Sequence, residues 1–290
     1  NADLPAGGSK AAAERMAEEF VRSGGTLRVG RRVLRLEHDG ATARSVVLSD
    51  GTTDEADHFI IATDPFSSYR ALTGRPLPRA LRKMSEDRRL FTFSSVHCAF
   101  SCPADPPFRG ELMLPLPDAA RGVYGAGSIA LREFSHEKNC APDGETVIQA
   151  FVFCDKKATD AYLYKYRDKK AYAAEKERFA ALAEETITTR FPALCGRLGL
   201  LDVWTPATYE RYTGSGSYMS FAFGAGYIPH RAGCRADGFD NVFLATQWLT
   251  PPGGLPNAAC AGKAAAEKIN ALCIKRSVRH VSAQGKADTV

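Results

Sequence analysis

DNVFLATQWLTPPGGLPNAACAGKAAAEKINAL, residues 240–272, is the stretch that most strongly indicates the fold. Residues 241–245 form an apolar run with the length of a buried strand. The two prolines and two glycines at 251–254 predict a turn, because neither residue type continues a strand or a helix well. Residues 257–272 are rich in alanine and carry apolar positions at helical spacing. The pattern therefore predicts a strand, a glycine turn and a helix.

Such a unit lets a helix N-terminus and bare backbone N–H groups approach a bulky anionic ligand. An ordinary strand-to-helix connection has the same spacing, so the spacing alone favours that simpler interpretation. The choice between the two depends on the rest of the chain.

The composition is that of a globular protein large enough to bury a substantial core. The chain has 290 residues, of which 44% are hydrophobic and 24% charged, which allows one large domain or two ordinary ones. Lys and Arg exceed Asp and Glu by 38 − 33 = 5, a mild and dispersed charge. A basic and aromatic run at 162–172 suggests either nucleic acid or a solvated helix entry, and we favour the latter. No nucleic-acid partner is expected.

The cysteines indicate neither a zinc site nor a disulfide scaffold. There are eight, none in a C-x-x-C pair, and the chain is not short and carries no secretory signal. Reduced thiols in a cytoplasmic protein are the expected state, and no metal site is predicted. No apolar run approaches the length of a membrane span.

Strand and helix patterns alternate along the chain and predict an α/β plus α+β fold. Helical periodicity occurs at 10–23 and 169–190. Strand patterns occur at 26–29, 33–37, 45–48, 56–62, 91–100, 123–130, 146–154 and 200–204. We expect the first and last segments to meet in one domain and the middle to form another.

No hydrolytic, metalloprotease or P-loop motif occurs, and no usable G-x-G-x-x-G is present. The six histidines are scattered, and a lone histidine is more often a satisfied polar residue than a ligand. Catalytic residues therefore stay unknown. The glycine turn, the helix N-terminus and an aromatic segment at 205–226 together suit an apolar or flat ligand.

Four stretches, taken in order, resemble the phytoene desaturase-like branch of the FAD-dependent amine oxidase and carotenoid desaturase superfamily. They are PAGGS at 5–9 with GGTL at 24–27 and VLRL at 33–36, ADHFIIATDP at 56–65, TPATYERYTG at 205–214, and NVFLA at 241–245 with PGGL at 252–255. The third is similar to a block of the bacterial members. The resemblance spans most of the chain.

The resemblance implies an incomplete Rossmann-like FAD-binding domain with an inserted mixed-sheet substrate domain. Residues 1–65 and 205–274 would belong to the first domain, 66–204 to the second, and 275–290 would be a polar tail. The cofactor would be FAD.

The resemblance also implies a role for individual residues. Val33 would lend its backbone to the adenine end, and Ala62, Thr63 and Asp64 would lie near the adenosine and pyrophosphate. The remaining residues implied at the flavin are Pro252, Gly253, Gly254 and Leu255, against the ribityl chain and isoalloxazine, and Trp248, which would flank the flavin or fill core. Tyr212, Tyr218 and Phe221 would line the substrate site.

One departure from the family affects cofactor binding. The family's N-terminal βαβ unit, with its G-x-G-x-x-G pyrophosphate turn, is not found, and the chain opens at Asn1 directly onto a helix-entry pattern. We interpret the chain as cut or as a segment of something longer. We expect the 290-residue chain alone to bind FAD poorly or not at all.

The function expected from the resemblance is that of an FAD-dependent oxidoreductase acting on an apolar substrate such as a polyene or isoprenoid. One alternative is a non-redox module for an apolar ligand or for membrane docking, with peripheral membrane contact. Another is a flavin amine oxidase, in which Trp248, Tyr212, Tyr218 or Phe221 would line an amine site. The oligomeric state is not indicated.

Overall fold

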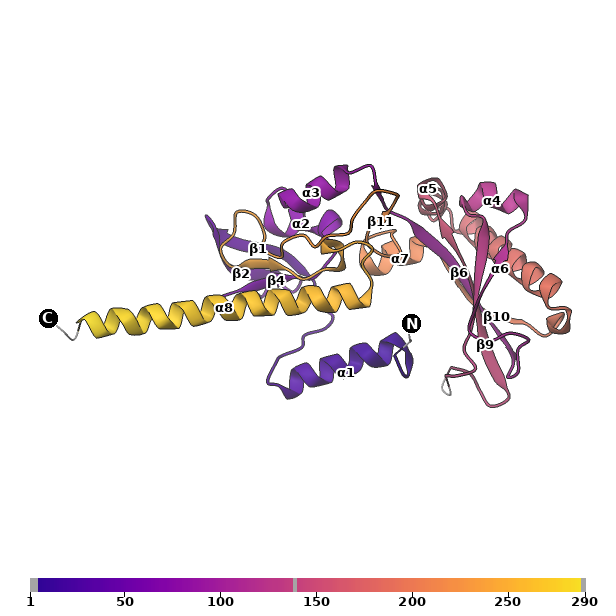
Figure 1. The fold of residues 1–290 in the computed structure, drawn as a ribbon, viewed down its shortest axis with the longest axis horizontal. Helices are drawn as coiled ribbons and strands as arrows, with labels where there is room; N and C mark the ends of the chain where they lie inside the picture. The colour runs from indigo at the N-terminus through magenta and orange to yellow at the C-terminus, as the bar shows by residue number, and fades with distance from the viewer. Residues whose placement is uncertain (1–4, 138–139, 288–290) are drawn as a thin grey trace. The chain divides into compact units, whose positions relative to one another are not determined.

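In the computed structural model, which describes residues 5–137 and 140–287, the chain forms two units (Figure 1). Unit 1 consists of the residues up to Gly30, Phe93–Tyr212 and Gly216–Tyr218. Unit 2 consists of Arg31–Thr92, Thr213–Ser215 and the residues from Met219 onward.

A five-stranded antiparallel sheet forms the centre of unit 1. Its strands follow the order β10-β6-β9-β8-β7. The strands are β6 Ser94–Pro103, β7 Glu111–Pro115, β8 Ser128–Glu133, β9 Glu145–Cys154 and β10 Gly199–Trp204. Strands β6 and β9 pair along their whole length, from Ser94 opposite Cys154 to Pro103 opposite Glu145. Neighbouring side chains on these two strands therefore alternate between the two faces of the sheet.

Three helices of unit 1, α4 Asp118–Tyr124, α5 Lys156–Lys165 and α6 Lys169–Arg190, pack on one face of this sheet. Unit 1 also contains α1 Gly8–Arg22, the short 3₁₀ helix η1 Pro192–Leu194 and α7 Pro206–Thr213. Helix α6 contacts β6 and β10. The Asp168 carboxylate caps it by accepting hydrogen bonds from the N–H groups of Lys170 and Ala171. Pro192 follows its end, since proline does not continue a helix.

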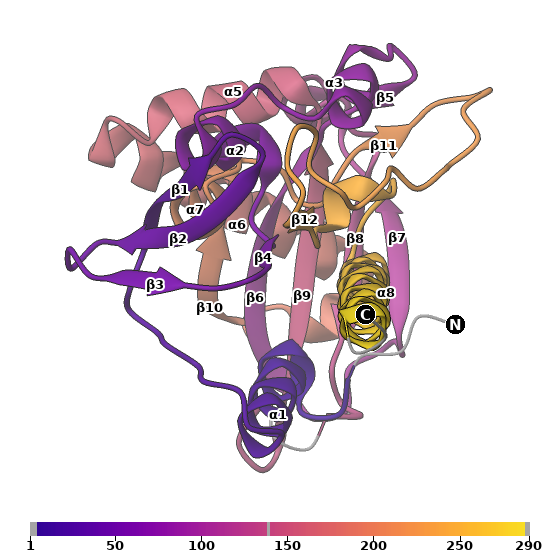
Figure 2. The ribbon, with the colours of Figure 1, turned by 90° about the vertical axis from the view of Figure 1, so that its left-hand side faces the viewer.

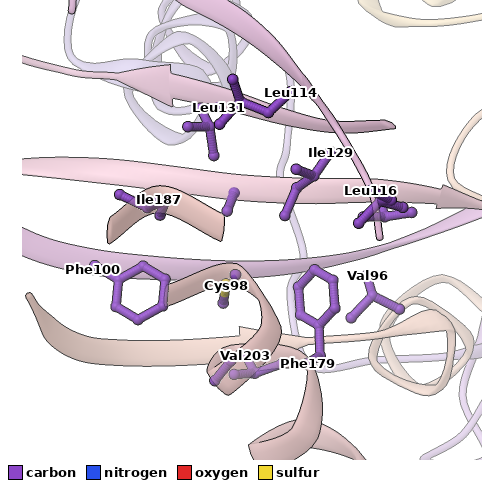
Figure 3. Packing of buried hydrophobic residues seen from close by; sticks show 14 of the residues in the cluster. Val96, Cys98, Phe100, Leu114, Leu116, Ile129, Leu131, Phe179, Ile187 and Val203 are labelled. Atoms are coloured by element: carbon purple, nitrogen blue, oxygen red, sulfur yellow. The ribbon is translucent and has the colours of Figure 1, made fainter. Parts of the chain in front are cut away.

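The core of unit 1 lies between α6 and this face (Figure 3). Helix α6 contributes Phe179 and Ile187, and alternate residues of β6 contribute Val96, Cys98 and Phe100. All five side chains are at most 1% exposed. Burial of such apolar surface is the main term that holds the helix on the sheet.

Unit 2 contains three small sheets, whose strands can be followed in Figure 2. Strands β1 Val33–Asp39, β2 Thr42–Leu48 and β3 Thr53–Glu55 form an antiparallel meander. Strands β4 Phe59–Ile61 and β12 Val242–Leu244 pair in parallel, and β5 Leu90–Phe91 pairs with β11 Ala222–Phe223. The helices are α2 Pro65–Thr73, α3 Arg79–Glu86, the short 3₁₀ helix η2 Gln247–Leu249 and α8 Leu255–Ala287.

A buried side-chain amide joins the meander to the parallel pair, next to a backbone bond from the Asp240 N–H to the Ala41 carbonyl at 2.8 Å. The side chain of Asn241 accepts a hydrogen bond from Ala43 N–H at 2.9 Å and donates to the carbonyls of Ala43 at 2.8 Å and Asp57 at 2.9 Å. Asn241 is 3% exposed. All three bonds therefore replace water that the buried backbone groups would otherwise need.

The structure confirms the mixed α/β class, and it confirms the helix expected at 169–190 with the same bounds. The hairpin around residues 38–40 is also present, since β1 and β2 pair on either side of Gly40. The predicted strand at 26–29 is wrong, because those residues adopt no regular secondary structure. The predicted strand at 123–130 is partly wrong. Val123 and Tyr124 form the end of helix α4, Gly125 follows with a left-handed φ of 70°, and the strand begins only at Ser128.

Helix α8 continues to Ala287, past the position expected for the start of a tail, and residues 288–290 lie outside the described part. The Rossmann-like character of one domain and the boundaries 1–65, 66–204 and 205–274 stay predictions. By contacts, residues up to Gly30 group with the five-stranded unit.

Candidate functional site

Two groups of predicted cofactor residues follow neighbouring parallel strands of unit 2. Strand β4 leads into Ala62, Thr63 and Asp64, and β12 leads through η2 into the glycine turn. Phe59 lies opposite Val242, so the two strands end at the same edge. Ligands of α/β proteins bind outside the carboxyl ends of parallel strands.

The turn before α8 is held by its own side chains. Gly253 and Gly254 both have a φ of 85°, which only glycine adopts without strain. The Gly254 N–H donates to Gln247 Oε1 at 2.8 Å, and the Asn257 side-chain amide donates to the Gly253 carbonyl at 2.8 Å. The backbone of the turn is therefore fixed before any ligand arrives.

The two glycines have different surroundings. A Cβ on Gly253 would meet Ser220 Cβ at 2.6 Å, whereas a Cβ on Gly254 would have only Pro256 Cδ near it, at 3.9 Å. Gly253 therefore permits close packing inside the unit, and Gly254 leaves its side of the turn open.

The start of α8 offers hydrogen-bond donors beside this open turn. Within the described part of the chain, the backbone N–H groups of Leu255 and Asn257 donate to no protein group. Leu255 is 65% exposed. Free N–H groups at the positive end of a helix favour anionic or acceptor-rich ligands. These donors and the open glycine fit a dinucleotide cofactor.

The predicted cofactor residues 62–64 differ from the glycine turn in their exposure and hydrogen bonds. Ala62 and Thr63 are exposed, and Thr63 Oγ1 lies 2.7 Å from Ser68 Oγ. The Asp64 carboxylate caps α2 by accepting from the Phe66 N–H at 2.9 Å. Burial raises the pKa of Asp64, although hydrogen bonds from Phe66 N–H and Ser215 partly oppose the rise.

The remaining predicted residues lie in different surroundings. Val33 opens β1 and is 39% exposed. Trp248 and Phe221 are each 5% exposed and pack in the core of unit 2, where their ring centroids lie 5.2 Å apart and both contact Phe66. Tyr212 belongs to unit 1 and is 76% exposed. The roles expected for these residues stay predictions.

Tyr218, the third residue predicted to line a substrate site, lines a cavity of about 530 Å³ in unit 1. This volume suits a small organic ligand. The wall includes aromatic residues of the sheet and of α7, together with polar groups. It is formed by Gly7, Gly8, Ser9, His97, Arg132, Phe134, Glu137, Cys140, Gln149, Trp204, Tyr209 and Tyr218.

His97 is the most enclosed polar group of this wall, at 3% exposed. Its ring is stacked between Phe151, with centroids 4.9 Å apart, and Trp204, at 5.1 Å. Its Nε2 lies 2.7 Å from Ser95 Oγ, which lies 3.2 Å from the Tyr209 hydroxyl. Sequence reasoning treated His97 as an isolated histidine and missed this cluster.

Burial keeps two titratable groups of this wall, His97 and Tyr209, uncharged. It lowers the pKa of His97 to about 3, with a further contribution from the positive charge of Arg132. Burial also raises the pKa of Tyr209 to about 12, against the lowering effect of its hydrogen bond with Ser95. Both groups are therefore neutral at pH 7.

Within residues 5–137 and 140–287, no three His, Cys, Asp or Glu side chains gather into a group able to hold a metal ion. In the same part of the chain, no helix has the length and apolar composition required to cross a membrane.

Comparison with known proteins places the chain in a family. The family model described as flavin containing amine oxidoreductase matches residues 2–270. A curated relative, the epsilon subunit of the NADH-dependent phenylglyoxylate dehydrogenase of Aromatoleum evansii, is 31% identical over 133 residues. This match covers 43% of the chain and 31% of the relative.

Solved structures show the same fold at low identity. An oxidoreductase from Methanosarcina mazei has a TM-score of 0.56 at 14% identity, covering 92% of this chain and 55% of its own. Wild-type putrescine oxidase bound to putrescine has a TM-score of 0.51 at 16% identity, covering 91% and 53%. The chain thus spans about half the length of these structures.

The family match covers more than half of the chain, and it confirms FAD as the expected cofactor. The phytoene desaturase-like branch is not distinguished by these comparisons. The chain belongs to the flavin containing amine oxidoreductase family.

Proposed function

We propose that the chain serves an FAD-dependent oxidoreductase in which unit 2 holds part of the flavin cofactor and unit 1 binds an apolar substrate of the desaturase kind. The proposal that unit 2 holds part of the flavin is supported by the fixed glycine turn at the start of α8. Beside this turn, the backbone N–H groups of Leu255 and Asn257 are free. Bound flavin would supply the hydride chemistry, and the protein would supply binding and orientation.

The substrate class is supported by the cavity of unit 1. Its aromatic wall contains Trp204, Tyr209 and Tyr218, and its buried histidine is neutral. The aromatic part of the wall favours apolar ligands, and the two charged groups of the wall are already partnered, Arg132 by the Glu111 carboxylate and Glu137 by the Gly7 N–H. The phytoene desaturase-like assignment extends this support to polyene or isoprenoid substrates.

A flavin amine oxidase is the second candidate. It is favoured by the likeness of the fold to putrescine oxidase, which is a likeness of fold alone. The aromatic residues expected to line an amine site are divided between the units, since Trp248 and Phe221 lie in the core of unit 2 and Tyr212 and Tyr218 belong to unit 1. A non-redox module, with or without peripheral membrane contact, is the third candidate, and the retained glycine turn argues against it.

Substrate-dependent bleaching of the flavin separates these candidates. We expect a flavin-loaded form of the protein, kept free of oxygen, to lose its flavin absorbance with a detergent-dispersed isoprenoid polyene. Putrescine and benzylamine should leave the spectrum unchanged, because the one carboxylate of the described wall, Glu137, already accepts a hydrogen bond from the Gly7 N–H.

The control is the same protein with detergent alone. Bleaching by the amines and not by the polyene would establish the amine oxidase instead. A flavin that neither class reduces would refute the apolar substrate.

A further inference from the structure

The five-stranded sheet of unit 1 has two edges, β10 and β7, which differ in their protection against a further strand (Figure 2). At β10 the register shifts between Leu200 and Asp202, and the Asp202 carboxylate pairs with the Lys176 ammonium at 3.5 Å. Bulges and charged side chains keep an edge strand from pairing with another chain. Strand β7 pairs with β8 without a shift, and its middle residue, Met113, is 58% exposed. The edge at β7 is therefore the one that a further strand can join.

Hydrogen bonds at both ends of β7 show which of its backbone groups face away from β8. The Gly110 carbonyl accepts from the N–H of the last residue of β8 at 3.1 Å, and the Leu116 N–H donates to the carbonyl of the residue before β8 at 3.0 Å. Such bonds recur at every second residue of an antiparallel pair, so the backbone groups of residues 112 and 114 also face β8. Those of residues 111, 113 and 115 face the open edge.

The open edge of β7 offers hydrogen-bonding groups that have no partner. Within residues 5–137 and 140–287, the N–H groups of Glu111 and Met113 donate to no group, and the carbonyls of residues 111, 113 and 115 accept from none. Pro115 has no N–H, so it can only accept. Unpaired groups along an exposed strand are a template for pairing with another chain.

We propose that this edge binds the same edge of a second copy of the chain, in an antiparallel pair with its twofold axis at Met113. Met113 and the partner's Met113 then exchange both of their N–H···O bonds. The Glu111 N–H donates to the carbonyl of the partner's Pro115, and the symmetric bond forms at the other end. All N–H groups of the two open edges are then paired, and Pro115 lies where only an acceptor is needed.

The side chains favour this register over the neighbouring one. The neighbouring register forms the same number of hydrogen bonds between residues 111 and 113, but it places Met113 opposite the partner's Glu111. In the proposed register the two methionines lie opposite each other, as an apolar cross-strand pair. This pair covers apolar surface that each copy alone leaves in water, since Met113 is 58% exposed.

A hollow of about 380 Å³ beside β7 has room for a side chain of the partner. It lies between the strand and the last turns of α6, and its lining residues are Leu114, Pro115, Pro117, Glu185, Thr186, Thr189 and Arg190. In the proposed register the partner's Leu112 lies opposite Leu114. Both side chains point to the face that carries α6, because Leu114 is buried in the core of unit 1 and Leu112 packs against that core. The partner's Leu112 therefore reaches the hollow.

The charges around the hollow also fit a second copy. The Glu185 side chain is exposed on the wall of the hollow, and among the described residues it forms no ion pair. Arg109 precedes β7 and pairs with Asp105, whose side chain is 92% exposed. In the proposed register the partner's Arg109 lies opposite Pro117, beside Glu185. Opposite charges that meet in this way favour the correct partner and register.

Sedimentation velocity and hydrogen exchange of the 290-residue chain test the proposal. A pair of short strands buries less than the ~800 Å² per partner of a stable interface, so we expect a micromolar dissociation constant. The chain should be a monomer at nanomolar concentration and a dimer at high micromolar concentration. The amides of Glu111 and Met113 should exchange more slowly as the dimer forms, whereas those of β10 should be unchanged.

Variants assign the dimer to β7. Met113→Pro removes an N–H that bonds to no described group of its own chain, and proline is tolerated at such an edge position. It removes two hydrogen bonds from the pair, so the dissociation constant should rise by about thirtyfold or more. Met113→Lys places two ammonium groups opposite each other and should weaken the dimer most at low salt. Leu201→Lys is the matched control, because Leu201 is 56% exposed on the other edge, and it should dimerise like the parent.

A chain that stays a monomer at high micromolar concentration overturns the proposal, as does a dimer that survives both Met113 variants or is lost in Leu201→Lys. Slow exchange of Glu111 and Met113 already in the monomer would show that another segment covers the edge, and it would overturn the proposal as well. If proline disturbs the strand, Met113→Lys still decides. None of these measurements involves flavin, so their failure leaves the proposed function untouched.

Discussion

Replacing Gly253 by alanine is expected to lower the free energy of unfolding of unit 2 by about 3 kcal/mol, by the sum of two costs. The first is the left-handed backbone, since φ is 85° and an L side chain is strained there. The second is overpacking, because the new Cβ would lie 2.6 Å from Ser220 Cβ and 3.0 Å from Ser220 N. Neither Ser220 atom belongs to the mobile end of a side chain.

Gly254→Ala is the matched control for this loss. Gly254 has the same φ of 85°, but the nearest atom to its Cβ would be Pro256 Cδ at 3.9 Å. The free energy of unfolding of Gly254→Ala should fall only by the cost of the left-handed backbone, about 1 to 2 kcal/mol.

Urea unfolding measures both losses. The chain has two tryptophans, Trp204 in unit 1 and Trp248 in unit 2, so in a Trp204→Phe background the fluorescence follows unit 2. Equal losses in the two glycine variants would contradict the close approach at Gly253.

Replacing Asn241 by leucine should cost about 4 kcal/mol of unfolding free energy in unit 2. Leucine has a similar volume, but it leaves the N–H and carbonyl of Ala43 and the carbonyl of Asp57 without their partner. The two Ala43 groups lie in the interior, since Ala43 is 1% exposed, whereas Asp57 is an exposed residue. Water cannot replace the lost bonds without opening the contact between the meander and the parallel strands.

Asp240→Leu supplies the comparison at the neighbouring position. Its side chain is 65% exposed and pairs with Arg235 at the surface. Surface ion pairs contribute about 0 to 1 kcal/mol, so this variant should unfold close to the parent. Urea unfolding followed by Trp248 fluorescence measures the stability of both variants. An Asn241→Leu protein as stable as the Asp240→Leu protein would show that the amide is not what joins the two sheets.

Elements with local signals could be predicted from the sequence. Helix α6 has an aspartate cap at 168 and a proline at 192, and both act within one turn of the helix ends. The hairpin at Gly40 has a turn that only glycine-like backbone permits. Residues 241–245 contain β12 because a short apolar run beside a glycine turn has few other stable arrangements.

Elements that depend on distant partners could not be predicted. Val123 and Tyr124 have strand-like side chains, yet they close helix α4, where Tyr124 is buried against the core of unit 1. Tertiary packing there overrides local propensity. The order β10-β6-β9-β8-β7 likewise follows from pairings between residues far apart in the sequence.

The same limit applies to the cavity. His97, Phe151 and Trp204 lie on three different strands, and only their register stacks the rings. One signal was available: residues 146–154, TVIQAFVFC, carry apolar residues on both faces of a strand. That pattern indicates a sheet whose second face is occupied, although it does not reveal which histidine joins it. The glycine turn was easier to find, because its chemistry lies within four consecutive residues.

The most direct test of the central claim is the absorbance spectrum of the protein as purified. It compares the 290-residue chain with the same chain extended upstream by a unit that carries G-x-G-x-x-G. The glycine turn and the start of α8 supply only part of the donors that a dinucleotide needs. We therefore expect the extended form to be yellow with bound flavin and the 290-residue chain to be colourless. Stoichiometric flavin in the short chain, or none in the extended form, would contradict this account.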